Sequence, residues 1–132
     1  MGFWSQRVST SSENTSLGSR SLKDLTSSSN QNTAIGAYTL HTVTSNSSEN
    51  TVLGYRAGYS LATGSNNIII GNDAEASTTT TSNEITFGDA NIKHLRVPGI
   101  GVSFNNTGGT QLGIITATEL DISGDILSLI HI

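Results

Sequence analysis

A short pattern, Asn-x-x-aliphatic-Gly, recurs at a nearly constant interval along this 132-residue chain. Successive glycines of the pattern, with a looser fifth copy included, are separated by 18, 18, 17 and 17 residues. Because a unit this short cannot bury its own apolar side chains, neighbouring units must stack and share a core. The interval predicts an all-β fold, a short-coil parallel β-roll or β-solenoid with 17–18 residues per coil. The structural repeat positions are Asn14, Gly18, Asn32, Gly36, Asn50, Gly54, Asn67, Gly71 and Gly88.

Within one coil, we expect a short strand that ends near the glycine, a second short segment with an apolar pair such as Leu22 and Leu25, and a polar return loop. This arrangement predicts two strands per coil. The asparagines occupy equivalent points of successive coils, where their side-chain amides can form a ladder along the stack. The glycines would allow backbones to approach closely, since they lack a Cβ.

The strand residues do not alternate between apolar and polar, because pairs such as Val52 and Leu53 are both apolar. We therefore expect both strand faces to be buried. One face would close the chain's own roll, and the other would pack against further copies around a common axis, as an intertwined homotrimer. The predicted repeat core consists of Leu17, Ile35, Leu53, Ile70 and Phe87.

The repeat interval ends after Gly88, and this change predicts a different architecture for the rest of the chain. Residues 1–13 form an N-terminal lead-in and residues 14–91 the β-roll repeats. Residues 92–126, with a turn at Pro98, form a β-hairpin, cap or shaft segment. Residues 127–132 resemble the translation of an adapter used in preparing sequencing libraries, and we expect this tail not to be native.

Composition argues against several classes of function. A net charge of -4 with only six Lys and Arg residues leaves no basic stripe for nucleic acid. No apolar run approaches the length needed for membrane insertion. The absence of cysteine removes thiolate nucleophiles and thiolate metal sites.

Residues typical of catalysis are scattered. His41, His94 and His131 have no carboxylate at metal-ligand spacing beside them, and the Gly-x-Ser-x-Gly motif is absent. We therefore expect no enzymatic activity, no catalytic residue, no metal and no cofactor.

Three tyrosines are the candidate surface contacts. Tyr38 and Tyr55 fall one or two positions after glycines of the repeat, where a tyrosine can cover a strand edge. The rings of Tyr38, Tyr55 and Tyr59 could also stack on sugar rings of a host envelope. Covering the strand edge is the structural interpretation, and sugar contact is the functional one.

The pentapeptides 32–36 and 50–54 resemble the head repeats of trimeric autotransporter adhesins, in which three chains share a left-handed parallel β-roll. Together with the stretches 85–102 and 113–126, the repeats are similar to fibre proteins of tailed bacteriophages, particularly those of marine cyanobacteria. This resemblance implies a structural segment of a virion appendage that spaces or presents a host-recognition tip. The implied partners are further copies of the chain, other virion proteins and a host cell-surface glycan or protein.

Two alternatives remain open. The same repeats would suit the head of a trimeric adhesin on a bacterial cell surface. Outward threonine ladders can also match an ice lattice, and Thr15, Thr33 and Thr51 form a short ladder that Ile68 and Ile85 interrupt.

Overall fold

A computed structural model describes residues 12–26, 28–98, 102–106 and 110–112. Within these residues every regular element is a β-strand, and the chain divides into two compact units after Ile92. Residues 1–11 of the predicted lead-in, the part of the predicted shaft segment beyond residue 112, and the predicted tail at 127–132 lie outside the described residues.

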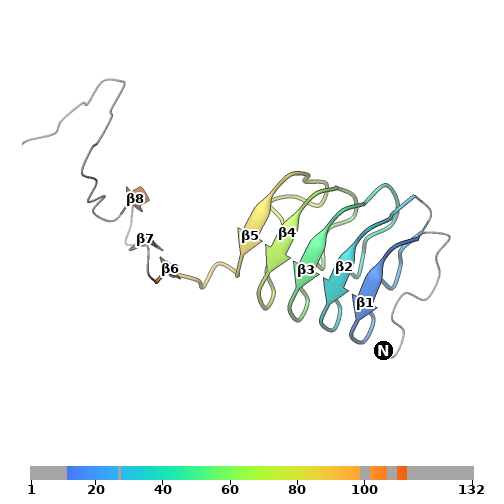
Figure 1. The fold of residues 1–132 in the computed structure, drawn as a ribbon, viewed down its shortest axis with the longest axis horizontal. Coiled ribbons are helices and arrows are strands. Elements are labelled where there is room, and N and C mark those ends of the chain that lie inside the picture. The colour runs from blue at the N-terminus through green and yellow to red at the C-terminus, as the bar shows by residue number, and fades with distance from the viewer. Residues whose placement is uncertain (1–11, 27, 99–101, 107–109, 113–132) are drawn as a thin grey trace, which may run out of the picture. The chain divides into compact units, whose positions relative to one another are not determined.

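The first unit carries one short strand per coil. The strands are β1 (Thr15–Leu17), β2 (Thr33–Ile35), β3 (Thr51–Leu53), β4 (Ile68–Ile70) and β5 (Ile85–Phe87). They lie side by side in chain order and all pair in parallel (Figure 1). The register places equivalent repeat residues opposite one another, so that Thr33 pairs with Thr51 and Thr51 with Ile68. The fold is therefore the all-β solenoid that the repeat interval predicts.

A ladder of asparagine side chains runs through the interior of the stack. The Nδ2 atom of Asn50 donates to Oδ1 of Asn32 at 2.9 Å, and Nδ2 of Asn67 donates to Oδ1 of Asn50 at 3.0 Å. Each of these oxygens also accepts the backbone N–H of the next asparagine. The remaining amide protons go to return-loop carbonyls, such as that of Gly64 for Asn50. The ladder thus joins each strand to its neighbouring coil and to its own return loop.

Glycine directly after the strand allows successive coils to stack closely. Gly54 has a φ of 136°, and a Cβ added there would overlap the carbonyl oxygen of Gly71 in the next coil. In the same way, a Cβ at Gly18 would overlap the carbonyl oxygen of Gly36, and a Cβ at Gly36 would overlap that of Gly54. The backbone therefore turns out of the strand at a point where only glycine fits.

The prediction of two strands per coil is wrong, because the second segment forms turns instead. Leu22 and Leu40 lie in these turns with φ values of 50° and 45°, which a strand cannot accommodate. Their backbone N–H groups still donate to the next coil, Leu22 to the carbonyl of Thr39 at 3.0 Å and Leu40 to that of Ala57 at 3.1 Å. Both leucine side chains are fully buried. The left-handed conformation thus directs a large apolar side chain inward without a strand.

The interior of each coil is filled by the middle residue of the strand and by the turn leucines. The fully or almost fully buried apolar side chains are Leu22, Leu25, Ala34, Leu40, Val43, Val52, Ala57, Leu61, Ile69 and Ala74. At the same strand position, the first and last coils carry Ser16 and Thr86, which are only partly buried. The core is therefore apolar in the central coils and more polar at both ends of the stack.

The residues that we expected to form the repeat core all lie on the outward face of the strands, opposite the interior. Leu17, Leu53 and Phe87 are 51%, 46% and 53% exposed, and Ile35 and Ile70 are partly buried. Side chains of a strand alternate between its two faces, so that burial of the middle residue turns both neighbours outward. The single chain therefore buries one strand face, and burial of the other face by further copies stays a prediction.

The second unit contains an antiparallel sheet. Its strands are β6 (His94–Val97), β7 (Val102–Asn106) and β8 (Thr110–Leu112), in the order β6-β7-β8. Leu95 pairs with Phe104, and Val97 pairs with Val102. All four side chains of β6 are exposed. The two strands expected on either side of Pro98 are present as the antiparallel pair β6 and β7.

Candidate functional site

One candidate site is the outward face of the parallel sheet. The last residue of each strand contributes to a row that we call the apolar column, formed by Leu17, Ile35, Leu53, Ile70 and Phe87. The pairing of β1 to β5 places these residues directly opposite one another in successive strands. About half of the surface of Leu17, Leu53 and Phe87 is exposed, which gives the solenoid a continuous apolar ridge.

A second row runs beside the apolar column and changes character along the stack. Thr15, Thr33 and Thr51 occupy its first three positions, and Ile68 and Ile85 occupy the next two. Ile85 is 62% exposed. The outward face thus becomes more apolar toward β5, and the threonine row is only three coils long.

A second candidate site lies on the turns that follow the strands. We call it the tyrosine edge, and it is formed by Arg20, Tyr38, His41, Tyr55, Arg56 and Tyr59. The rings of Tyr38 and Tyr55 meet edge to face, with centroids 6.1 Å apart. His41 stacks on Tyr59 with centroids 4.9 Å apart and planes at 11°. Tyr38 also approaches His41, at 5.5 Å. The four rings form one continuous aromatic cluster that spans two coils.

Two arginines border this cluster. The guanidinium of Arg20 lies 5.4 Å from the ring centroid of Tyr38 and donates to the Tyr38 hydroxyl at 3.1 Å. The guanidinium of Arg56 lies 4.7 Å from the centroid of Tyr59 and pairs with Asp73 at 3.3 Å. Cations at these distances are attracted to the face of the ring. The arginines therefore hold the rings in place, and the charge of Arg56 is offset by Asp73.

His41 is a partly buried titratable group of the tyrosine edge. Its Nδ1 atom is buried and has no hydrogen-bond partner. Burial lowers the pKa of His41, and the positive charges of Lys23 and Arg20 act in the same direction, while Asp24 opposes them. The neutral imidazole is therefore favoured and contributes a flat ring to the cluster.

The three tyrosines that the sequence marked as candidate surface contacts all lie in this cluster. Tyr55 is 50% exposed, whereas Tyr38 and Tyr59 are partly buried. Sequence reasoning missed the two arginines and assigned no role to His41. The repeat register could have identified them, because Arg20, Tyr38 and Arg56 are spaced by 18 residues and so occupy the same place in three successive coils.

Other chemistry is not assembled in the part of the chain that the structure describes. There, no three His, Cys, Asp or Glu side chains come together in a way that could hold a metal ion. The same residues include no helix that could cross a membrane. His41 and His94 belong to different units, and His131 lies outside the described residues. The absence of enzymatic activity stays a prediction.

Comparison of this chain with protein-family models, curated proteins and solved structures found no match. Its function is therefore argued from the two surfaces described above.

Proposed function

We propose that this chain is a structural segment of a phage appendage fibre, in which three copies associate and space or present a host-recognition tip. The observation that carries the proposal is the apolar column. Five outward side chains in register form a continuous apolar surface, in which Leu17, Leu53 and Phe87 are about half exposed. Contiguous exposed apolar surface is typical of sites that contact another protein. Such a surface is stabilised when it is covered.

The geometry of the column favours another copy of the same chain as the partner. Strands in a parallel stack are spaced by roughly 4.8 Å, and an identical stack repeats at the same spacing. Two copies can therefore interlock at every coil, whereas a partner with another period would match at only a few points. Closed rotational symmetry is the usual arrangement of identical subunits. In a closed trimer around an axis parallel to the stack, each column can contact both neighbours.

The second unit supports the same conclusion. Leu95 and Val97 of β6 are 41% and 38% exposed and stand two residues apart, on one face of their strand. A small sheet with exposed apolar side chains gains stability by packing against another layer. Both units thus carry apolar strand surfaces that further copies of the chain would cover.

The mass of the protein in solution tests this assembly. Size exclusion with light scattering should give a mass of three chains. The double variant Ile35→Asp/Leu53→Asp should give a mass of one chain, because two charges per copy would have to be buried at the interface. The control Ser28→Asp/Thr80→Asp adds the same charge at exposed return-loop residues and should leave the mass unchanged. A well-folded monomer of the unaltered chain would overturn the assembly.

The location of the protein separates the phage fibre from the bacterial adhesin. Antibodies against this chain should label appendages of purified phage particles in electron microscopy. Labelling of bacterial cells in the absence of phage would instead favour the surface adhesin, which the resemblance of the pentapeptide repeats supports.

A further inference from the structure

We propose that the tyrosine edge is a binding site for glycans that contain carboxylated sugars, such as uronic or sialic acids. This inference goes beyond the structural role, because all six residues of the edge belong to one chain. It combines two features of the edge, which are an exposed aromatic surface and an arginine with no acidic partner.

The aromatic surface is exposed and held in position. Tyr55 presents half of its surface to solvent, while its ring is fixed edge to face against Tyr38. The backbone of Tyr38 lies in the left-handed region, with a φ of 61°, and its N–H donates to the carbonyl of Ser19 in the preceding coil. A sugar has an apolar C–H face that packs on an aromatic ring, and a ring that is already ordered loses little entropy on binding.

The cations of the edge differ in how far they are neutralised. Lys23 pairs with Asp24 at 2.6 Å, and Arg56 pairs with Asp73 at 3.3 Å. Among the described residues, Arg20 contacts no carboxylate, and its guanidinium donates to the hydroxyl of Tyr38. A guanidinium carries five N–H donors in a planar fork that suits a carboxylate. Arg20 is thus the group that would bind the acid of the sugar.

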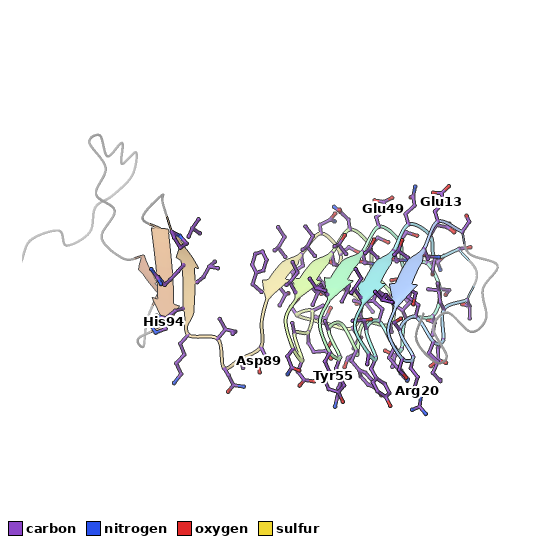
Figure 2. The ribbon with its side chains drawn as sticks, turned by 60° about the horizontal axis from the view of Figure 1, so that its bottom comes forward. Glu13, Arg20, Glu49, Tyr55, Asp89 and His94 are labelled. Carbon is purple, nitrogen blue, oxygen red and sulfur yellow. The ribbon has the colours of Figure 1, made fainter. Side chains whose placement is uncertain are left out.

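The attraction for a carboxylate comes from Arg20 itself and not from the overall charge of the edge. All Lys and Arg residues between positions 12 and 92 are Arg20, Lys23 and Arg56. Asp24 and Asp73 offset Lys23 and Arg56, and the Glu75 carboxylate accepts the N–H of Ser60, so that the edge carries no net positive charge. Glu13 and Glu49 lie along one edge of the coil stack, and Arg20 and Tyr55 lie along the opposite edge (Figure 2). A carboxylated sugar beside Tyr55 would therefore meet the guanidinium of Arg20 and stay away from these two glutamates.

Paired oligosaccharides test the proposal on the full chain by titration calorimetry or NMR. Oligogalacturonate is compared with its methyl ester, and sialyllactose with lactose, so that each pair isolates the carboxylate. At least one acid should bind tenfold more tightly than its neutral counterpart, and the difference should shrink as salt is added. Absence of binding by both acids up to millimolar concentration, or equal binding of acid and neutral partner, would overturn the proposal.

Variants locate the site. Tyr55→Ala and Arg20→Gln should each weaken binding of the acid at least tenfold, whereas Glu49→Gln on the opposite edge should leave binding unchanged or slightly tighter. The thermal midpoint and the solution mass should stay the same in Tyr55→Ala, which separates lost contact from lost fold. If Tyr55→Ala binds as tightly as the unaltered chain, the tyrosine edge is not the site.

The Ile35→Asp/Leu53→Asp variant keeps this proposal distinct from the proposed assembly. A short oligosaccharide occupies one edge at a time, so that its affinity per chain should be the same in this variant as in the unaltered protein. Loss of the trimer with retained binding would leave the glycan site standing, and an intact trimer without binding would leave only the structural role.

Discussion

Asn50 donates its Nδ2 to Oδ1 of Asn32 at 2.9 Å, and its backbone N–H donates to the same oxygen at 3.0 Å. One side-chain oxygen thus accepts two bonds from the next coil. Both asparagines are buried, so that water cannot take the place of a lost hydrogen-bond partner. The pair shows why asparagine recurs at this position, because a side chain with both a donor and an acceptor can continue the ladder in two directions.

Replacement of Asn50 by alanine should destabilise the protein more than the small change in side-chain volume suggests. Asn50 accepts two bonds from Asn67 and donates to Asn32 and to the carbonyl of Gly64. Leaving these buried groups unpaired should lower the free energy of unfolding by about 3–4 kcal/mol. Urea unfolding measures the change. Asn72→Ala removes an exposed asparagine and should cost about 0.5 kcal/mol or less. Equal effects would contradict the role of the ladder.

Two glycines of the same coil should respond differently to alanine. In Gly54→Ala the new Cβ overlaps the backbone of Gly71 at a φ of 136°, and we expect loss of the folded state or a cost above about 3 kcal/mol. In Gly58→Ala the φ is 58°, and the nearest atoms are Leu40 Cδ2 at 3.1 Å and Ile69 Cδ1 at 3.3 Å.

The equivalent positions of the earlier coils tolerate leucine at a similar φ, namely Leu22 and Leu40. Gly58→Ala should therefore cost about 1 kcal/mol. Thermal unfolding followed by circular dichroism compares the two variants. A mild Gly54→Ala would show that the coils can separate locally without loss of the fold.

Neighbouring isoleucines of β4 provide a matched test of which strand face is the core. Ile69 is fully buried and Ile68 is exposed. Ile69→Ala should lower the free energy of unfolding by about 3 kcal/mol, because it leaves a cavity in the shared core. Ile68→Ala should change it by about 1 kcal/mol or less in dilute protein. If denaturant titrations show a larger loss of stability for Ile68→Ala than for Ile69→Ala, then Ile68 and not Ile69 faces the core.

Stability should fall as the pH is lowered through the range in which His41 titrates. Burial lowers the pKa of folded His41 relative to its ordinary value of about 6.5. Between the folded pKa and about 6.5, the unfolded chain binds more protons than the folded chain, so that the free energy of unfolding decreases as pH falls across this window. Above about pH 6.5 this group contributes no pH dependence. The charged or titratable groups around His41 are Arg20, Lys23, Asp24, Tyr38 and Tyr59.

His41→Phe should remove this decrease, because phenylalanine keeps a flat ring beside Tyr59 and does not titrate. The measurement is the thermal midpoint from about pH 5 to about pH 8 for both proteins. The midpoints should diverge as pH falls. Parallel curves would show that carboxylates, and not His41, control stability in this range.

The repeat interval was enough to predict the solenoid and its register. Two positions of the coil leave little choice of residue, since asparagine must both donate and accept inside the stack and glycine must stand where a Cβ would overlap the next coil. Requirements of this kind are visible in a single sequence because they recur. Part of the tyrosine edge was accessible in the same way, since Arg20, Tyr38 and Arg56 share the 18-residue register, as do His41 and Tyr59.

The sequence by itself therefore determined the coil length, the parallel stacking and the positions of the ladder residues. It did not determine which strand face is the interior, because Val52 and Leu53 are both apolar and the usual alternation is missing. Only the tertiary structure decided this. The left-handed turn residues Leu22 and Leu40 bring their side chains to one side of the sheet, and closure of the coil there buries Val52 and leaves Leu53 facing outward.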